Sequence, residues 1–396
     1  MGRESAAGGP LQGLLVADFS RVLAGPYASM LLADMGAEVV KVESPGGDDT
    51  RTWRPPVHEG VSTYFLGVNR NKRSVALDLK DERDVGLAQE LARRADVVLE
   101  NFKPGGLRRF GLDYETVAET NPAIVYASIS GFGTGGGASL PGYDLMVQAI
   151  SGLMSLTGDP DGSPYRAGIS VFDVMAGMHA TIGVLAALHK RSETGAGQHV
   201  EVNLLSSALS GLVNHASAVV TAGVVPYRMG NSHPSLFPYD ALPAADRELI
   251  ITAGNDTQFR KLCEVLEVPG LADDPRFRHN HDRTANRHEL RPLLVDRLAT
   301  RTADDWFQRL ITAGVPCGPI NTVDQGVAFA EDLGLDPVVQ VGNGDRIVPS
   351  VRHPIAFSST PADYRLPPPL LDEHGDEIRG WLAERQVDAP GRTSTA

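Results

Sequence analysis

The chain has 396 residues, which at roughly 150 residues per domain corresponds to two or three domains. It carries 36 Lys and Arg against 49 Asp and Glu, a formal net charge of −13. This acidity excludes a general nucleic-acid-binding protein, although a local basic patch can still bind a small phosphorylated ligand. Cys263 and Cys317 are the only cysteines, which excludes a disulfide scaffold and is typical of a cytoplasmic protein.

The predicted elements alternate between strands and helices over the first 130 residues. The expected strands are 14–20, 38–44, 74–79, 96–102 and 123–130, with helices at 81–95 and 113–120. This alternation predicts right-handed crossovers and a parallel sheet covered on both faces. Because ligands of such sheets bind outside the carboxyl ends of the strands, we expect the site there.

Further along, HVEVNLL (199–205) predicts one more strand, followed by an apolar stretch at 204–225. Several Ser, Asn and His residues interrupt that stretch, so we interpret it as a buried helix rather than a membrane span. The first residues lack an apolar segment of signal-peptide length, so we expect a soluble, cytoplasmic protein. The predicted domains are 1–225, a smaller domain at 226–330, and a return segment at 331–396 that completes the large domain.

Asp173 is the first residue that suggests chemistry. It follows a glycine-rich loop, in GISVFDVMAG, and precedes a nearly all-apolar helix. Asp at a helix start is most simply an N-cap, whose carboxylate accepts backbone N–H bonds. The alternative is a carboxylate nucleophile that forms a covalent intermediate with a carbonyl substrate in an enclosed pocket.

Two basic loops lie beside predicted strands, NRNKRS (69–74) and NFKPGGLRRFG (101–111). Either loop alone is most simply a solvated surface. Together, in an acidic protein and near the expected ligand edge, they predict a binding region for phosphate and purine.

Several familiar sites are missing from the sequence. The first strand–helix turn is SRVLAGP, which lacks the GxGxxG pattern of an NAD-binding site, and HExxH, GxSxG and Walker motifs do not occur. His279 and His281, in RFRHNHDR, fit a solvated loop better than a metal site, so we expect no metal. The glycine-rich turns GFGTGGG (131–137) and the turn at Gly230 offer backbone N–H groups to a ligand.

These segments, in this order, resemble the class III CoA-transferases, the CaiB/BaiF family. The resemblance extends over nearly the whole chain and rests on the segments PLQGLLVADFSRVLAGPYASMLLADMGAEVVKVESPGGDDTR, LGVNRNKRSVALDLK, ENFKPGGLRRFGLDYETV, GYDLMVQAISGLMSLTGDPDGSPYRAGISVFDVMAG and GNSHPSLFPYDALPAADRELIITAGNDTQF.

The resemblance implies a Rossmann-like parallel-sheet large domain, a smaller α+β domain, and a homodimer of two interlocked ring-shaped chains. It implies that Asp173 is the nucleophile and that coenzyme A, as a substrate rather than a resident cofactor, binds at a set of basic, amide and aromatic residues. These are Asn69, Asn71, Lys72, Arg73, Asn101, Phe102, Lys103 and Arg109. The chain departs from the family pattern at Ser44, where an Arg is expected, and at Leu23, where formyl-CoA transferases have Gln.

The expected activity is transfer of CoA from an acyl-CoA to a carboxylic acid, through an anhydride and a thioester on Asp173. One alternative is an α-methylacyl-CoA racemase, which would pair the same Asp with a His; the corresponding position here is Tyr143. A second alternative is a non-catalytic CoA-binding module, and a dehydrogenase is disfavoured by the missing GxGxxG. The sequence does not identify the donor or acceptor acid.

Overall fold

The computed structural model describes residues 8–344 and 346–384. The chain forms two compact units. The larger contains the residues up to Leu153, Arg166–Val224 and the residues from Asp336 onward, and the smaller contains Met154–Tyr165 and Val225–Leu335. The sequence-based boundaries lay at 226 and 330, and the structure also assigns the segment 154–165 to the smaller unit.

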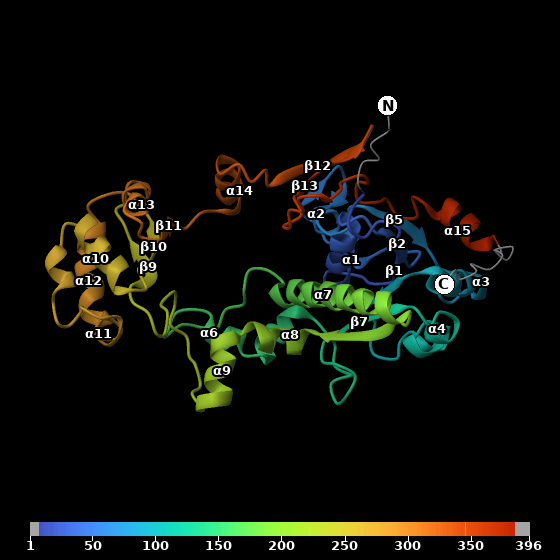
Figure 1. Cartoon of the computed structure of the whole chain (residues 1–396), viewed down its shortest axis with the longest axis horizontal. Coiled ribbons are helices and arrows are strands. Elements are labelled where there is room, and N and C mark those ends of the chain that lie inside the picture. Colours follow the sequence, from blue (N-terminus) through green and yellow to red (C-terminus); the bar gives the residue numbers. More distant parts are fainter. Residues whose placement is uncertain (1–7, 345, 385–396) are drawn as a thin grey trace. The chain divides into compact units, whose positions relative to one another are not determined.

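A six-stranded sheet forms the centre of the larger unit (Figure 1). Its strands are β1 (Leu15–Asp18), β2 (Glu38–Glu43), β5 (Lys72–Ala76), β6 (Val97–Glu100), β7 (Val125–Ser130) and β8 (Gln198–Asn203). All neighbouring pairs are parallel, in the order β5-β2-β1-β6-β7-β8. The predicted parallel α/β sheet is therefore confirmed, and the strand order reverses between β1 and β6, where such sheets bind ligands.

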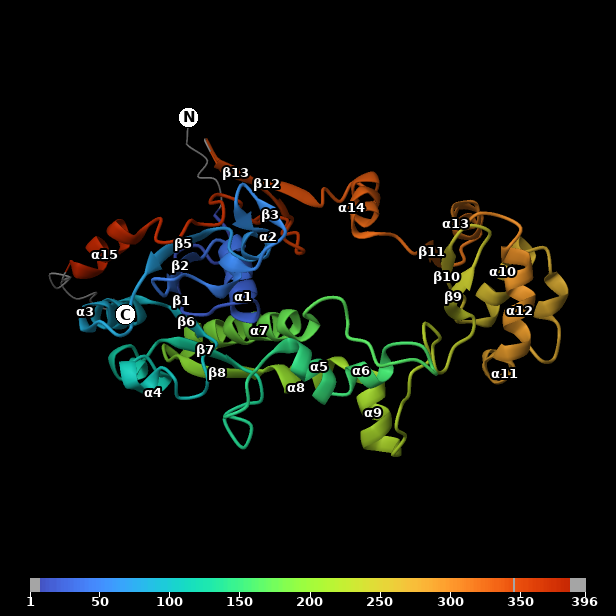
Figure 2. The same ribbon diagram turned by 180° about the vertical axis from the view of Figure 1, so that it is seen from behind.

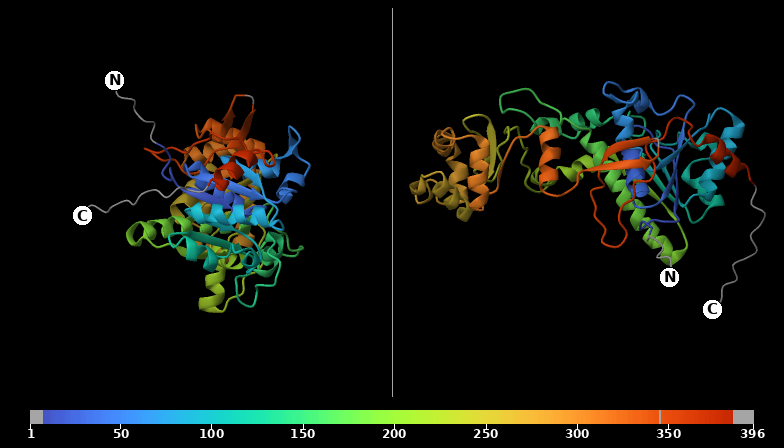
Figure 3. Two further views of the ribbon diagram at one scale, coloured as in Figure 1. Left: turned by 90° about the vertical axis from the view of Figure 1, so that its right-hand side faces the viewer. Right: turned by 90° about the horizontal axis from the view of Figure 1, so that it is seen from above.

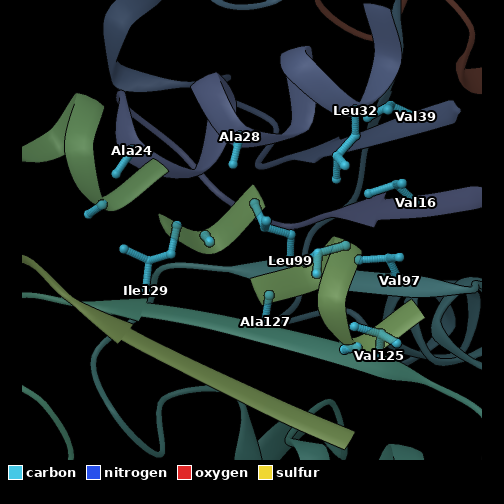
Figure 4. Close-up of a cluster of buried hydrophobic side chains, with 14 of the residues drawn as sticks. Val16, Ala24, Ala28, Leu32, Val39, Val97, Leu99, Val125, Ala127 and Ile129 are labelled. Atoms are coloured by element: carbon cyan, nitrogen blue, oxygen red, sulfur yellow. The ribbon is translucent and has the colours of Figure 1, made fainter. Parts of the chain in front are cut away.

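Helices cover both faces of this sheet because each strand buries alternate side chains on opposite sides. On one face, α1 (Ala24–Asp34) and α7 (Val171–Thr194) pack over apolar strand residues such as Val16, Val97 and Val125 (Figure 4). On the other face lie α3 (Glu82–Arg94), α4 (Tyr114–Thr120) and α15 (Gly375–Ala383), all labelled in Figure 2.

Helix α7 and the pair α8 (Leu204–Gly211) and α9 (Val213–Ala222) are the described segments long and apolar enough to cross a membrane. Helix α7 packs against α1, α8, β7 and β8, as the core helix of a soluble fold does. The prediction of one buried helix at 204–225 is wrong. The chain bends by 84° between α8 and α9, and α9 exposes Val213 and Val220.

The return segment packs on the N-terminal part of the larger unit. It begins with a hairpin of β12 (Val338–Asn343) and β13 (Arg346–Val351), drawn in red beside the blue elements in Figure 3. The buried Asp34 carboxylate accepts from Arg70 at 2.6 Å and is 3.2 Å from Nδ1 of His353. A second bond joins Arg70 to the Val351 carbonyl, so this cluster holds the segment in place.

The smaller unit is α+β, as expected. An antiparallel sheet of β9 (Tyr239–Pro243), β10 (Glu248–Thr252) and β11 (Cys317–Pro319) packs with α10 (Asp256–Val265), α12 (Arg287–Leu298) and α13 (Ala303–Thr312) around a buried core. The expected loop RFRHNHDR instead contains α11 (Asn280–Ala285), and His279 caps this helix. The described residues contain no group of His, Cys, Asp or Glu that could hold a metal ion.

The remaining elements are short or peripheral: the hairpin β3 (Val57–His58) and β4 (Val61–Ser62), α2 (Thr63–Leu66), α5 (Asp144–Ile150), α6 (Leu153–Leu156), α14 (Val323–Asp332), and 3-10 turns at Asp49–Thr52, Arg108–Phe110 and Pro269–Ala272.

Candidate active site

Asp173 lies in a cavity of about 80 Å³ at the carboxyl ends of β6 and β7. The loop after β6, the end of β7 and the first residue of α1 line it together with Asp173. The lining residues are Ala24, Asn101, Phe102, Lys103, Pro104, Ile129, Ser130, Gly131, Leu140, Gly142, Asp173 and Leu204. The cavity therefore lies at the sheet edge where the sequence predicted the site.

The carboxyl of Asp173 is held in a setting that disfavours its ionised form. Burial, and after it the negative charge of Asp144, raises the pKa of Asp173 to about 7. A carboxylate with a raised pKa holds its electrons less tightly, so its ionised form is a better nucleophile than an ordinary aspartate. This perturbation, inside a cavity at the ligand edge, is typical of a catalytic group.

Asp144, at the start of α5, caps the helix that carries Asp173. Its Oδ1 accepts from the backbone N–H groups of Phe172 at 2.8 Å and of Asp173 at 3.2 Å. Asp173 itself is the third residue of α7, and the residue before the helix, Ser170, makes no side-chain cap bond. The interpretation of Asp173 as the N-cap is therefore wrong, and the capping carboxylate comes from another helix.

Gln148, one turn after Asp144 on α5, fixes the loop that precedes α7. Its Oε1 accepts from the Ala167 N–H at 2.8 Å, and its Nε2 donates to the Ile169 carbonyl at 3.1 Å and to Asp144. Sequence reasoning missed both residues. The signal was the Asp-to-Gln spacing of four in YDLMVQ, which places the two side chains on one helix face.

A larger cavity of about 440 Å³ lies behind the loop 102–104, which lines both cavities. Glu100 is buried there, and its Oε2 accepts from the Phe102 N–H at 2.7 Å. Burial raises the pKa of Glu100 to about 7. In the same cavity, the hydroxyl of Ser128 lies 2.9 Å from Nε2 of His199. Sequence reasoning missed Glu100, Ser128 and His199 because they lie within predicted apolar strands.

The predicted CoA ligands fall into two groups. Asn101, Phe102 and Lys103 line the Asp173 cavity, whereas Arg109 does not, and its guanidinium lies 4.5 Å from the ring of Phe110. Their role in CoA binding stays a prediction.

The second group, Asn69 to Arg73, precedes and opens β5, at the amino ends of the strands. Asn71 and Arg73 line a separate cavity of about 370 Å³ with residues at the starts of β1 and β2. Asn69 and Lys72 are fully buried and bond to each other at 2.9 Å, and Lys72 also pairs with Asp18. None of these residues lines the Asp173 cavity, and their role in CoA binding stays a prediction.

The two glycine-rich turns belong to different units of the fold. Gly131 and Gly142 line the cavity and lie so close that a Cβ on Gly131 would be 2.4 Å from the Gly142 Cα. Gly230 belongs to the smaller unit, where its N–H donates to the Gly158 carbonyl at 3.1 Å.

The chain matches the model of CoA-transferase family III over residues 11–375. The chain belongs to this family. Among curated relatives, this CoA-transferase is 42% identical to the succinate–glutarate CoA-transferase of Agrobacterium fabrum, with 98% of each chain covered. It is 41% identical to the acetyl-CoA:oxalate CoA-transferase of Acetobacter aceti, covering 95% of this chain and 96% of that one.

Among solved structures, a CaiB/BaiF family protein from Brucella suis superposes with a TM-score of 0.85 at 43% identity. The match covers 95% of the CoA-transferase described here and 100% of the Brucella chain. These findings confirm the predicted family, the fold class and the enzyme class.

Asp144→Asn tests the electrostatic coupling in this cavity. The amide oxygen can still accept the two α7 bonds, but the negative charge is gone, so the pKa of Asp173 should fall. The acid limb of kcat against pH, measured between about pH 5 and 9, should then move to lower pH. An acid limb at the same pH as in the parent enzyme would contradict the electrostatic coupling between Asp144 and Asp173.

Proposed function

We propose that the enzyme moves CoA from an acyl-CoA to a carboxylic acid through covalent intermediates on Asp173. The supporting observation is the position of Asp173: a half-buried carboxylate, with its pKa raised to about 7, in a small cavity at the ligand edge of the sheet. Such a carboxylate can attack a thioester carbonyl and be regenerated at the end of the cycle.

In the first half of the cycle, a side-chain oxygen of Asp173 bonds to the acyl carbon, and the carbon–sulfur bond breaks. The products are an aspartyl–acyl anhydride and CoA thiolate. The thiolate then bonds to the Asp173 side-chain carbon and expels the donor acid as a carboxylate. The result is an aspartyl-CoA thioester.

In the second half, an oxygen of the acceptor carboxylate bonds to the same Asp173 carbon and expels CoA thiolate. The thiolate attacks the acceptor carbonyl of this second anhydride, which releases the new acyl-CoA and the Asp173 carboxylate. No proton is consumed overall. Because anhydrides hydrolyse readily, water must be kept out, which the small buried cavity favours.

The CoA itself would bind along the loop after β6. Phe102 offers an apolar surface to the thiol-bearing arm, and the exposed Arg109 offers a cation to the phosphates. In this binding mode the thioester end would lie at Asp173, because Asn101 to Pro104 line the same cavity.

Asp173→Ala should lower kcat about 10⁴-fold or more, because no other group in the proposed cycle can take its place. With the parent enzyme, acyl-CoA and hydroxylamine, mass spectrometry should find a hydroxamate on the peptide that contains Asp173. The exposed carboxylate variant Asp376→Ala serves as the matched control and should keep full activity.

Thermal unfolding at about pH 8 tests whether the Asp173→Ala variant is still folded. Above pH 7 the half-buried, ionised Asp173 costs stability, because its folded-state pKa lies above its unfolded value. Asp173→Ala should therefore melt at or above the parent temperature. Near-parent turnover in this variant would sink the proposed mechanism.

For the acceptor, we propose a short dicarboxylic acid. The two curated relatives are named for succinate, glutarate and oxalate, all dicarboxylates. Lys103 lines the Asp173 cavity with an exposed side chain, and an ammonium group there suits a second carboxylate.

With succinyl-CoA as donor, kcat/KM for glutarate should exceed that for valerate, a monoacid of the same chain length, by about 10-fold or more. Mesaconate and oxalate complete the panel, which is read by mass spectrometry of the acyl-CoA products. Equal kcat/KM values for the diacid and the matched monoacid would exclude selection for a second carboxylate.

We also propose a homodimer. On the larger unit, α9 exposes Val213, Val219 and Val220, and α7 exposes Ile182, a concentration of apolar surface that favours a second copy of the chain. Light scattering should give twice the chain mass, and Val220→Asp should shift it toward the single chain. A single-chain mass for the parent at micromolar concentration would contradict the proposal. A cytoplasmic location stays a prediction.

A further inference from the structure

The turn between β1 and α1 has a backbone conformation that its sequence does not favour. Val22 has φ +69°, in the left-handed region. A β-branched residue rarely adopts this conformation, because its Cβ crowds the neighbouring carbonyl. The turn must therefore be held in shape by contacts with the rest of the fold.

Asn101 supplies two of those contacts. Its Oδ1 accepts from the Arg21 N–H at 2.9 Å, and its Nδ2 donates to the Arg21 carbonyl at 2.7 Å. Both polar groups of this amide are thus bonded to the backbone of one residue, directly before Val22. Asn101 follows β6, so the bonds cross the place where the strand order reverses.

The next contacts come from the loop after β2. The Val22 N–H donates to the carboxylate of Asp48 at 3.2 Å. The buried Lys41 binds that carboxylate at 3.0 Å and also donates to the Ser20 carbonyl at 3.0 Å. Three successive residues of the turn, Ser20 to Val22, are therefore held through backbone groups.

The turn positions one wall of the active-site cavity. Ala24, two residues after Val22, lines the cavity with Asp173. A Cβ on Gly177, one helical turn after Asp173, would lie 2.6 Å from the Ala24 carbonyl oxygen, so α1 and α7 touch through their backbones here. A shift of the turn would therefore move this wall against the helix that carries Asp173.

A second part of the cavity lining directly follows Asn101 in the chain. Phe102 and Lys103, directly after Asn101, line the cavity, and Glu100 fixes the Phe102 N–H from behind. Asn101 therefore connects the β1–α1 turn to the loop after β6, and both segments contribute residues to the lining of the Asp173 cavity.

We propose that Asn101 is a positioning residue of CoA transfer. It holds the strained β1–α1 turn, and thereby the distance between the cavity walls and the attacking carboxylate, rather than binding CoA through its amide. The proposal rests on Asp173 as the nucleophile. It differs from the family resemblance, which made Asn101 a CoA ligand.

Asn101→Ala should lower kcat by about 10- to 100-fold, because small misplacements of reacting groups cost rates of that order. The KM for acyl-CoA should change less than about threefold. The matched control is Asn121→Ala, which also removes an amide bonded to a backbone carbonyl, at 2.8 Å from the Ala95 oxygen, but away from the site. A raised KM with an unchanged kcat would instead identify a CoA ligand and overturn the proposal.

Val22→Gly provides a rescue test, because glycine adopts the left-handed conformation freely. In the Asn101→Ala background it should restore kcat by about fivefold or more, since the turn no longer needs the same support. If Asn101 instead binds CoA, Val22→Gly should not restore kcat in the Asn101→Ala background, and that result would also overturn the proposal.

Hydrogen exchange separates this proposal from the assignment of Asp173. In Asn101→Ala, amides of the peptide Phe19–Tyr27 should exchange faster than in the parent, and Asn121→Ala should leave them unchanged. Unaltered exchange in Asn101→Ala would overturn the positioning role, whatever the nucleophile. An active Asp173→Ala variant would instead overturn the mechanism while leaving the exchange result intact.

Discussion

The chemistry of this enzyme depends on a carboxylate held where its charge is unfavourable. Asp173 is half-buried in a small cavity, and both this burial and the negative charge of Asp144 raise its pKa. The fold tolerates this arrangement because Asp144 is itself held by two N–H groups at the start of α7. The Asp144 carboxylate therefore both caps α7 and raises the pKa of the nucleophile Asp173.

Side chains, rather than regular secondary structure, fix the loops around this carboxylate. Asp144, Asp48, Glu100 and Asn101 each bond to backbone N–H groups at the carboxyl edge of the sheet. Loops at this edge must leave room for a ligand, so they cannot pair with each other as strands do. These polar side chains give the loops fixed positions without filling the cavity, as the reacting groups require.

Much of the fold could be predicted because strand and helix periods are local properties. All six strands of the parallel sheet occur near the predicted positions, and Asp173 was found from its place after a glycine-rich loop and from the family resemblance. Glu100 could not be found this way, and for Asp144 only its spacing from Gln148 was a local signal, because its partners on α7 are distant in sequence. The direction of the Lys72 side chain, and the bend that exposes Val220, likewise depend on tertiary packing that composition does not encode.

The central claim is that Asp173 becomes covalently bonded to the acyl groups that it exchanges. The direct test is turnover with an acceptor acid whose carboxylate carries ¹⁸O, followed by mass spectrometry of the peptide that contains Asp173. If the acid forms an anhydride with Asp173, one of its oxygen atoms stays on the aspartate when CoA thiolate takes the acyl group. Incorporation of ¹⁸O at Asp173 during turnover is the predicted result, and an unlabelled Asp173 after many turnovers would contradict the account.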